Sequence, residues 1–126
     1  MKKIDCNRKY YTYELIDERS GKPFYVGTGS KHRMYEHEQE ARQVFMSGKY
    51  DLMTHKQKRI IEILEDHGEI GYNIIHCTRS QEEAYSVEAA RIKEIGLYRL
   101  TNERYGHQDD PGDSEEYDFG DDSDPD

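Results

Sequence analysis

Apolar and polar positions alternate near the start of the chain in the way that is typical of a β-hairpin. The alternation over residues 9–17 predicts one strand, and the aromatic and β-branched residues 24–26 predict a second. Residues 18–23 (ERSGKP) predict the connecting turn, because glycine and proline interrupt regular structure. Gly27 and Gly29 are expected to let the backbone turn sharply out of the second strand. One face of the first strand is large and apolar or aromatic: Tyr11, Tyr13 and Leu15.

The period of the pattern then changes to that of helices. Residues 31–46 carry one apolar stripe and predict a helix, and residues 54–67 predict another that begins at a threonine cap and stops at Gly68. Residues 70–78 predict a third strand, and residues 80–96 predict a third helix opened by a Ser-x-x-Glu capping box. This order predicts a small α/β (α+β) domain, with a mostly antiparallel three-stranded sheet flanked by about three helices.

Charge is distributed unevenly along the chain. The 126 residues have a formal net charge of −9, but residues 108–126 hold ten of the acids and no base. Residues 1–107 contain the other 17 acids and all 18 Lys and Arg, so the net charge of this part is close to zero. We therefore predict a folded domain over residues 1–107 and an acidic, disordered tail over residues 108–126. The whole-chain charge does not exclude a nucleic-acid partner.

The sequence also predicts the cellular compartment of the protein. No apolar run approaches the roughly 18 residues of a membrane span, and the first six residues lack the apolar stretch of a signal peptide. An intracellular, cytoplasmic protein with no membrane partner is therefore expected. Cys6 and Cys77 are too few and too far apart to predict a disulfide framework or a Cys-based zinc site, so two reduced thiols without a role are expected.

Glu88 is a charged residue within the apolar stripe of the third predicted helix, four residues after Ala84 and four before Ile92. Burying a lone carboxylate is costly unless it is paired, protonated or bound to a metal. A rim position facing solvent, or a salt bridge to Arg91 or Lys58, would explain Glu88 without a function. A single carboxylate also suits Mg²⁺, which keeps most of its water ligands and needs only one or two protein carboxylates.

Arg33 and His37 are four residues apart and share one face of the first predicted helix. A guanidinium stabilises charge on a phosphate, and an imidazole transfers protons near neutral pH. Both residues could instead belong to a solvated helix surface, with neighbouring glutamates as partners. Tyr13 and Tyr25 lie in the two hairpin strands with eleven residues between them. They form either a packed aromatic pair or a site in which a nearby cation lowers the pKa of a phenol.

Basic residues open the second predicted helix. Three bases in the four residues 56–59 can follow a DNA backbone with little sequence preference. A hydrated helix start explains them equally well. The residues concerned are His55, Lys56, Lys58 and Arg59.

Taken in order, these residues resemble the GIY-YIG endonuclease family. Tyr11-Thr12-Tyr13 stands where the family has its first signature triplet, and Tyr25-Val26-Gly27 stands where it has the second. The first triplet lacks its glycine, and Val26 replaces the signature isoleucine. The resemblance covers residues 9–105. The single residues that match are, in order, Arg33, His37, His55, Glu88 and Asn102.

The resemblance implies hydrolysis of DNA phosphodiester bonds with one divalent metal, Mg²⁺ or Mn²⁺ in its place. Glu88 would hold the metal, and Arg33 would neutralise charge on the phosphoryl oxygens. Tyr13, Tyr25 or His37 would position or deprotonate the attacking water. Substrate contacts are expected from Gly27, His55, Lys56, Lys58, Arg59 and Asn102. The rival interpretation is a catalytically inactive module of the same fold that binds nucleic acid or a protein.

The acidic tail admits three roles. It is a solubilising extension, a mimic of DNA that covers the basic rim, or a docking segment for a basic partner protein. If it mimics DNA, removal of residues 108–126 is expected to increase nicking at low salt. Cutting both strands of a duplex with one site requires a homodimer or two successive encounters.

Overall fold

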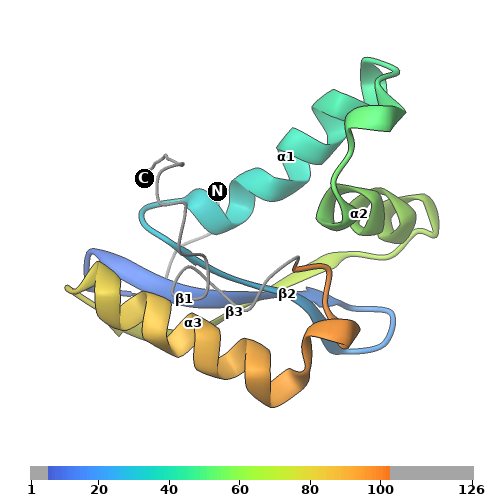
Figure 1. Ribbon diagram of the computed structural model, residues 1–126. Coiled ribbons are helices and arrows are strands. Elements are labelled where there is room, and N and C mark those ends of the chain that lie inside the picture. Colours follow the sequence, from blue (N-terminus) through green and yellow to red (C-terminus); the bar gives the residue numbers. More distant parts are fainter. Residues whose placement is uncertain (1–5, 103–126) are drawn as a thin grey trace.

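The computed structural model describes residues 6–102 and contains one antiparallel sheet with helices on both faces (Figure 1). The central strand β1 pairs with β2 on one side and with β3 on the other. This arrangement confirms the predicted α+β class with three strands and three helices. The elements are β1 (Tyr10–Asp17), β2 (Lys22–Gly29), α1 (Arg33–Met46), α2 (His55–Glu65), β3 (Ile70–Thr78) and α3 (Gln81–Ile95), with short 3-10 helices η1 (Tyr50–Leu52) and η2 (Leu97–Arg99).

β1 is buried on both faces because it lies in the middle of a three-layer structure. α1 and α2 cover one face of the sheet and α3 covers the other (Figure 1). The predicted apolar face of β1, including Tyr13, enters the core beneath α1 and α2. The opposite face contacts α3, where Thr12 donates a hydrogen bond from Oγ1 to the Ala84 carbonyl at 2.8 Å. There Glu14, 3 % exposed, accepts a hydrogen bond from Arg91.

β2 is longer than the sequence predicts, and its two later glycines do not form a turn. Gly27 and Gly29 lie within the strand, paired with Tyr13 and Tyr11 of β1. A Cβ atom at Gly27 would lie 2.8 Å from the Tyr13 hydroxyl, so this position lacks a side chain because the site residue occupies the space. The chain leaves β2 after Gly29, and Lys31 between β2 and α1 has a φ of +54°; the hairpin turn falls within the predicted residues 18–23, where Gly21 has a φ of +76°.

The helix ends follow the predicted capping residues only in part. Thr54 caps α2 in a full capping box with Gln57. Ser80 accepts from the Glu83 backbone N–H, but the Glu83 carboxylate is 2.5 Å from Nε2 of His76 and does not close a box. α2 ends before Gly68, and the positive φ of 61° falls on His67. None of the helices in residues 6–102 is both long enough and apolar enough to cross a membrane.

The expectation of two reduced thiols is wrong. Cys6 and Cys77 form a disulfide, and their Cα atoms are 5.9 Å apart although 71 positions separate them in the chain. Antiparallel pairing places Tyr11 opposite Cys77, so the residues before β1 lie beside the end of β3. Sequence separation does not reveal this contact, because strand pairing creates it. The predicted domain boundary after residue 107 and the acidic tail lie outside the described residues.

Candidate active site

The centre of the candidate site is a buried contact between β1 and α1. Tyr13 is 1 % exposed and His37 is 2 % exposed. The Tyr13 hydroxyl lies 2.5 Å from Nε2 of His37, within hydrogen-bonding distance. β1 supplies the tyrosine at the middle of the sheet, and the first two turns of α1 supply the histidine above it. Residues 24 positions apart in the sequence thus form one polar pair inside the core.

Burial keeps both members of this pair uncharged. It raises the pKa of the Tyr13 hydroxyl well above its usual value, and the neighbouring Tyr25 adds to this effect. Burial also lowers the pKa of His37 well below its usual value, and the positive charges of Lys56 and Arg33 lower it further. With Tyr13 as donor and Nε2 as acceptor, one hydrogen bond satisfies both atoms. Nδ1 of His37 is buried without a hydrogen-bond partner among the described residues.

Tyr25 of β2 forms the second wall of the site. Its ring centre is 6.3 Å from that of Tyr13 and 5.4 Å from that of His37. Nζ of Lys56 lies 4.7 Å from the centre of the same ring, a cation–π contact. Desolvation and the negative charge of Glu88 raise the pKa of Tyr25, while Arg33 opposes them. Charged side chains from three different helices therefore lie close enough to Tyr25 to interact with its ring or to change its pKa.

Arg33 is the first residue of α1, and its side chain is 39 % exposed. Its Nη1 donates to Glu40 at 2.6 Å and to Glu36 at 3.1 Å, so it uses the intrahelical partners that the sequence offers. Its charge still acts on the rings of the site, since it lowers the pKa of His37 and opposes the rise at Tyr13. The guanidinium therefore lies at the rim, between the buried pair and solvent.

Glu88 enters the site from the opposite face of the sheet. It is 4 % exposed and accepts a hydrogen bond from Oγ1 of Thr28 at 2.7 Å. The rim position considered from the sequence is excluded by this burial. The alternative salt bridge to Arg91 is not formed, since Arg91 pairs with Glu14 and Glu94. The register places Thr28 opposite Thr12, with both hydroxyls directed at Ala84 of α3.

The donor set fits a hydrated hard cation. Within residues 6–102, no group of three or more His, Cys, Asp or Glu side chains could hold a metal ion together. A metal at this site would therefore take one carboxylate oxygen, from Glu88, and water for its other ligands. Mg²⁺ accepts such a set because it dehydrates reluctantly and binds oxygen. A Zn²⁺ site would need three or four protein ligands.

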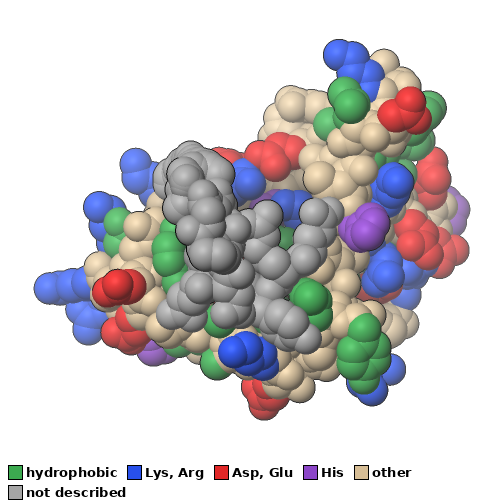
Figure 2. Space-filling model, viewed as in Figure 1, with side chains coloured by type: hydrophobic (Ala, Val, Ile, Leu, Met, Phe, Trp, Pro, Cys, Tyr) green, Lys and Arg blue, Asp and Glu red, His purple; other side chains and the backbone are tan. Residues whose placement is uncertain are grey.

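The basic start of α2 is divided between two surfaces. Lys56 faces Tyr25, and Arg59, one turn later, lies 6.0 Å from the ring centre of Phe24. Lys58 lines a different cavity, together with Arg19. His55 is exposed at the first turn. Figure 2 shows Lys, Arg and His side chains exposed together over α2.

Asn102 and Gly27 have backbone roles beside the site. The Val26 N–H donates to Oδ1 of Asn102 at 3.0 Å, and Nδ2 donates back to the Val26 carbonyl at 2.8 Å. The asparagine thus pairs with the open edge of β2 as a short strand would, next to Tyr25. Thr28 was not among the predicted site residues. A signal for it existed in the alternation of β2, which places Thr28 on the Glu88 side of the sheet.

The structure is a small α+β fold in which two tyrosines, a histidine, an arginine and a buried glutamate are grouped around β1 and β2. A family model described as the LEM-3-like GIY-YIG domain matches residues 12–118. The match spans most of the chain, and the chain belongs to the GIY-YIG family. Membership indicates a nuclease with DNA as its substrate. Searches of curated proteins and of solved structures gave no significant match.

Proposed function

We propose that this chain is a metal-dependent DNA endonuclease that hydrolyses phosphodiester bonds at the Tyr13–His37 pair. The observation that carries the proposal is the 2.5 Å contact between these two uncharged side chains inside the core, with Tyr25 against both rings. A buried polar pair with an unpartnered nitrogen is costly for stability alone. Such groups are concentrated at sites where protons are transferred.

The two side chains provide a route for the proton of the attacking water. The water proton moves to the Tyr13 oxygen while the Tyr13 proton moves to Nε2 of His37. The O–H bonds of the water and of Tyr13 break, and a new O–H bond on Tyr13 and an N–H bond on His37 form. The hydroxide oxygen then bonds to phosphorus as the bond from phosphorus to the leaving oxygen breaks. A phosphate beside Arg33 and Lys56 offsets the two cations that lower the pKa of His37. Substrate binding therefore makes His37 a better proton acceptor. Tyr25 is left to orient the water or the phosphate from the opposite wall.

The charged groups act on the phosphate. Glu88 would hold the divalent cation, Mg²⁺ or Mn²⁺, whose charge when bound polarises the scissile phosphate and stabilises the leaving oxygen. Arg33 would neutralise charge on the phosphoryl oxygens. For this role a phosphate oxygen must replace Glu36 or Glu40 as a partner of the guanidinium. Both glutamates are more than 40 % exposed, so they can turn to solvent at little cost.

The test is nicking of supercoiled plasmid in Mg²⁺ by wild type and by Glu88→Gln. The amide keeps an oxygen that can accept from Thr28 but removes the negative charge, so nicking is expected to fall to the level without metal. Glu82→Gln, an exposed change in the first turn of the same helix, is the matched control and is expected to nick like wild type. Equal nicking by Glu88→Gln and wild type would overturn the assignment. DNA binding without cutting under Mg²⁺ and Mn²⁺ would favour the inactive binding module.

A further inference from the structure

We propose that a cationic groove along the first half of β2 binds the backbone phosphates that flank the scissile bond on the same DNA strand. The proposal rests on the nuclease function above. The groove, called here the β2 groove, is a cavity of about 690 Å³ between α2 on one side and α3 with η2 on the other. Its charged lining consists of Lys22, Arg59, Arg91 and Arg99, with Asp17 and Glu94.

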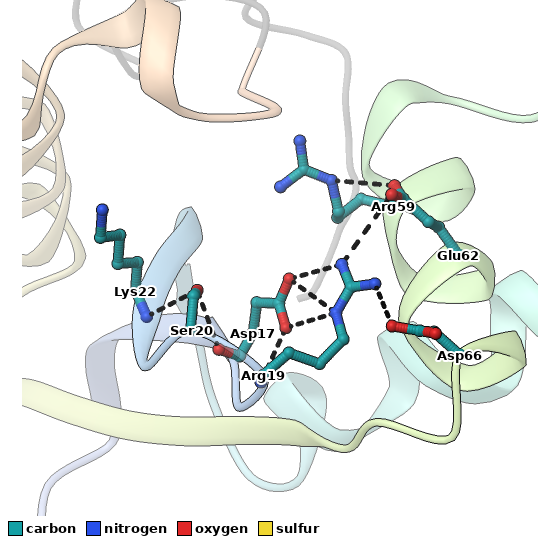
Figure 3. A network of polar contacts seen from close by, with 7 residues as sticks. All are labelled: Asp17, Arg19, Ser20, Lys22, Arg59, Glu62 and Asp66. Atoms are coloured by element: carbon teal, nitrogen blue, oxygen red, sulfur yellow. Dashed lines mark hydrogen bonds and ion pairs between the residues drawn. The ribbon is translucent and has the colours of Figure 1, made fainter.

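The cations of the β2 groove are more available than its carboxylates. Asp17 is held by Arg19, and Glu94 is held by Arg91, which also pairs with Glu14 and is therefore not an available cation. Lys22 and Arg99 are exposed and have no carboxylate partner within residues 6–102. Arg59 meets Glu62 only through Nε, at 3.4 Å, and its guanidinium extends to the same side of the hairpin as Lys22 (Figure 3). Positive charge therefore predominates on the surface that a ligand would meet.

The β2 groove continues the candidate active site. Lys56 and Arg59 are three residues apart on α2 and share a face, where the first contacts Tyr25 and the second contacts Phe24. Phe24 lines the groove and Tyr25 lines the site. From Tyr25 to Lys22 the strand covers about 10 Å, at about 3.3 Å per residue. This length suits contact with the backbone phosphates next to the scissile bond on one DNA strand.

Two other cavities of residues 6–102 have the opposite charge. A cavity of about 610 Å³ beside η1 has Arg19 and Lys58 against three carboxylates, Glu62, Glu65 and Asp66. Another, of about 650 Å³ beside the Tyr35–Tyr72 pair, has Arg42 against Glu38 and Glu69. A polyanion would be repelled from both. The excess of cations thus distinguishes the β2 groove from these two cavities.

The test compares two double variants of the full chain that remove the same charge. Lys22→Gln with Arg99→Gln changes the β2 groove. Lys9→Gln with Arg79→Gln changes two exposed cations beside Tyr10 and Thr78, at the opposite end of the sheet, where Tyr10 pairs with Thr78. For each form, plasmid nicking in Mg²⁺ gives the maximum rate and the half-saturating DNA concentration. Fluorescence anisotropy with a labelled duplex, without metal and over a range of NaCl, gives the affinity and its dependence on salt.

The groove variant is expected to need about tenfold more DNA for half-saturation, with an unchanged maximum rate. The slope of log affinity against log salt is expected to become shallower by about 2, because each lost phosphate contact removes about 0.9. The control variant should keep the wild-type values within about twofold. Equal losses in both variants, or an increased rate in the groove variant, would overturn the proposal. An increased rate would assign the groove to an acidic segment of the protein.

The two proposals can fail separately. Absence of nicking in wild type with every divalent metal would overturn the nuclease, while anisotropy would still decide whether the groove binds DNA. Normal nicking with no difference between the groove and control variants would overturn the groove alone.

Discussion

The turn and the middle of the β1–β2 hairpin both carry polar side chains, but these are partnered in different ways. At the turn, Arg19 donates to Asp17 through Nε and Nη2, and to Asp66 through Nη1 (Figure 3). Asp17 also accepts from the Arg19 backbone N–H. We call this set, with Glu62 at its edge, the hairpin clasp. It ties the turn to the end of α2, and its charges are paired.

In the middle of the hairpin the polar groups are more deeply buried, and one of them, a histidine nitrogen, lacks a partner among the described residues. Tyr13 and His37 share one short contact, and Nδ1 of His37 has no partner among the described residues. Glu88 is held by a neutral hydroxyl, that of Thr28. An unsatisfied buried polar group lowers stability, so its presence suits a binding or catalytic role better than a structural one. The clasp stabilises the hairpin, and the site uses the hairpin as its support.

Of the substitutions that test the difference between the two regions, Tyr13→Phe should have the largest effect on nicking. Loss of the hydroxyl removes the proton route and leaves Nε2 of His37 without its partner. Nicking is expected to fall by about 10²–10⁴-fold, the usual contribution of a general acid or base. The measurement is the initial rate of plasmid nicking in Mg²⁺ at a protein concentration that saturates the DNA. Tyr11→Phe, which loses a hydrogen bond to the Lys31 carbonyl, is the matched control for a buried phenol outside the site. Equal loss in both variants would contradict a special role for Tyr13.

Substitution of two glycines, one in the middle of the hairpin and one at its turn, tests the same difference between the site and the clasp. Gly27→Ala places a Cβ atom 2.8 Å from the Tyr13 hydroxyl and from the Tyr25 ring, so both phenols must shift. We expect a loss of about 10- to 100-fold in nicking, because small displacements of catalytic groups are costly. Gly21→Ala at the turn meets no atom within 4 Å but has a φ of +76°. It should cost about 1 kcal/mol in the free energy of unfolding and leave the nicking rate unchanged. The contrast fails if Gly21→Ala impairs nicking as much as Gly27→Ala.

The fold could be predicted from the sequence where the signal is local. The helical stripe of α1, the threonine cap of α2 and the strand pattern of residues 70–78 depend on neighbouring residues, and the predicted bounds of these elements are nearly those observed. Gly27 shows the limit of such reasoning. A glycine in a short strand is typical of a turn, but the reason for it is contact with Tyr13, fourteen residues earlier and on another strand. The Cys6–Cys77 disulfide depends on strand pairing in the same way.

The candidate site shows the same division. The order of Tyr13, Tyr25 and His37 suggested one site, and the structure brings their rings together. Lys56 and Lys58 were predicted to act together, yet they point to different surfaces. Residues two apart on a helix do not share a face, so helical geometry alone could have separated them. No local signal indicates that Asn102 pairs with the Val26 backbone, since that contact joins segments 76 positions apart.

Asp17→Asn should weaken the clasp without affecting the chemistry. The carboxylate is 10 % exposed and accepts several hydrogen bonds from Arg19, whose charge holds the pKa of Asp17 below its usual value. Loss of this charge is expected to cost about 2 kcal/mol in the free energy of unfolding, in the range for hydrogen bonds to charged groups. Urea denaturation at pH 7 measures it. Glu62→Gln, at the exposed edge of the clasp, should change stability by less than about 0.5 kcal/mol. Nicking by folded Asp17→Asn should match wild type, and a loss of more than about tenfold would show that the clasp belongs to the site.

The site and the clasp should affect the pH dependence of stability in different pH ranges, because His37 and Asp17 titrate at different pH. The pKa of folded His37 lies well below the ordinary value of 6.5, so below that pH the unfolded chain takes up a proton that the folded chain does not. The free energy of unfolding should therefore fall by up to about 1.4 kcal/mol per pH unit as the pH drops from 6.5 toward 5.

Urea denaturation between pH 5 and pH 7 tests this dependence with two variants. His37→Gln has no titrating group at this position and should flatten the curve. Asp17→Asn should keep the wild-type slope, because the pKa of Asp17 is lowered from 3.8 and its contribution is lost only as the pH falls below that value. Parallel curves for His37→Gln and wild type would mean that His37 titrates alike in the folded and the unfolded protein, which would contradict a buried, neutral Tyr13–His37 pair.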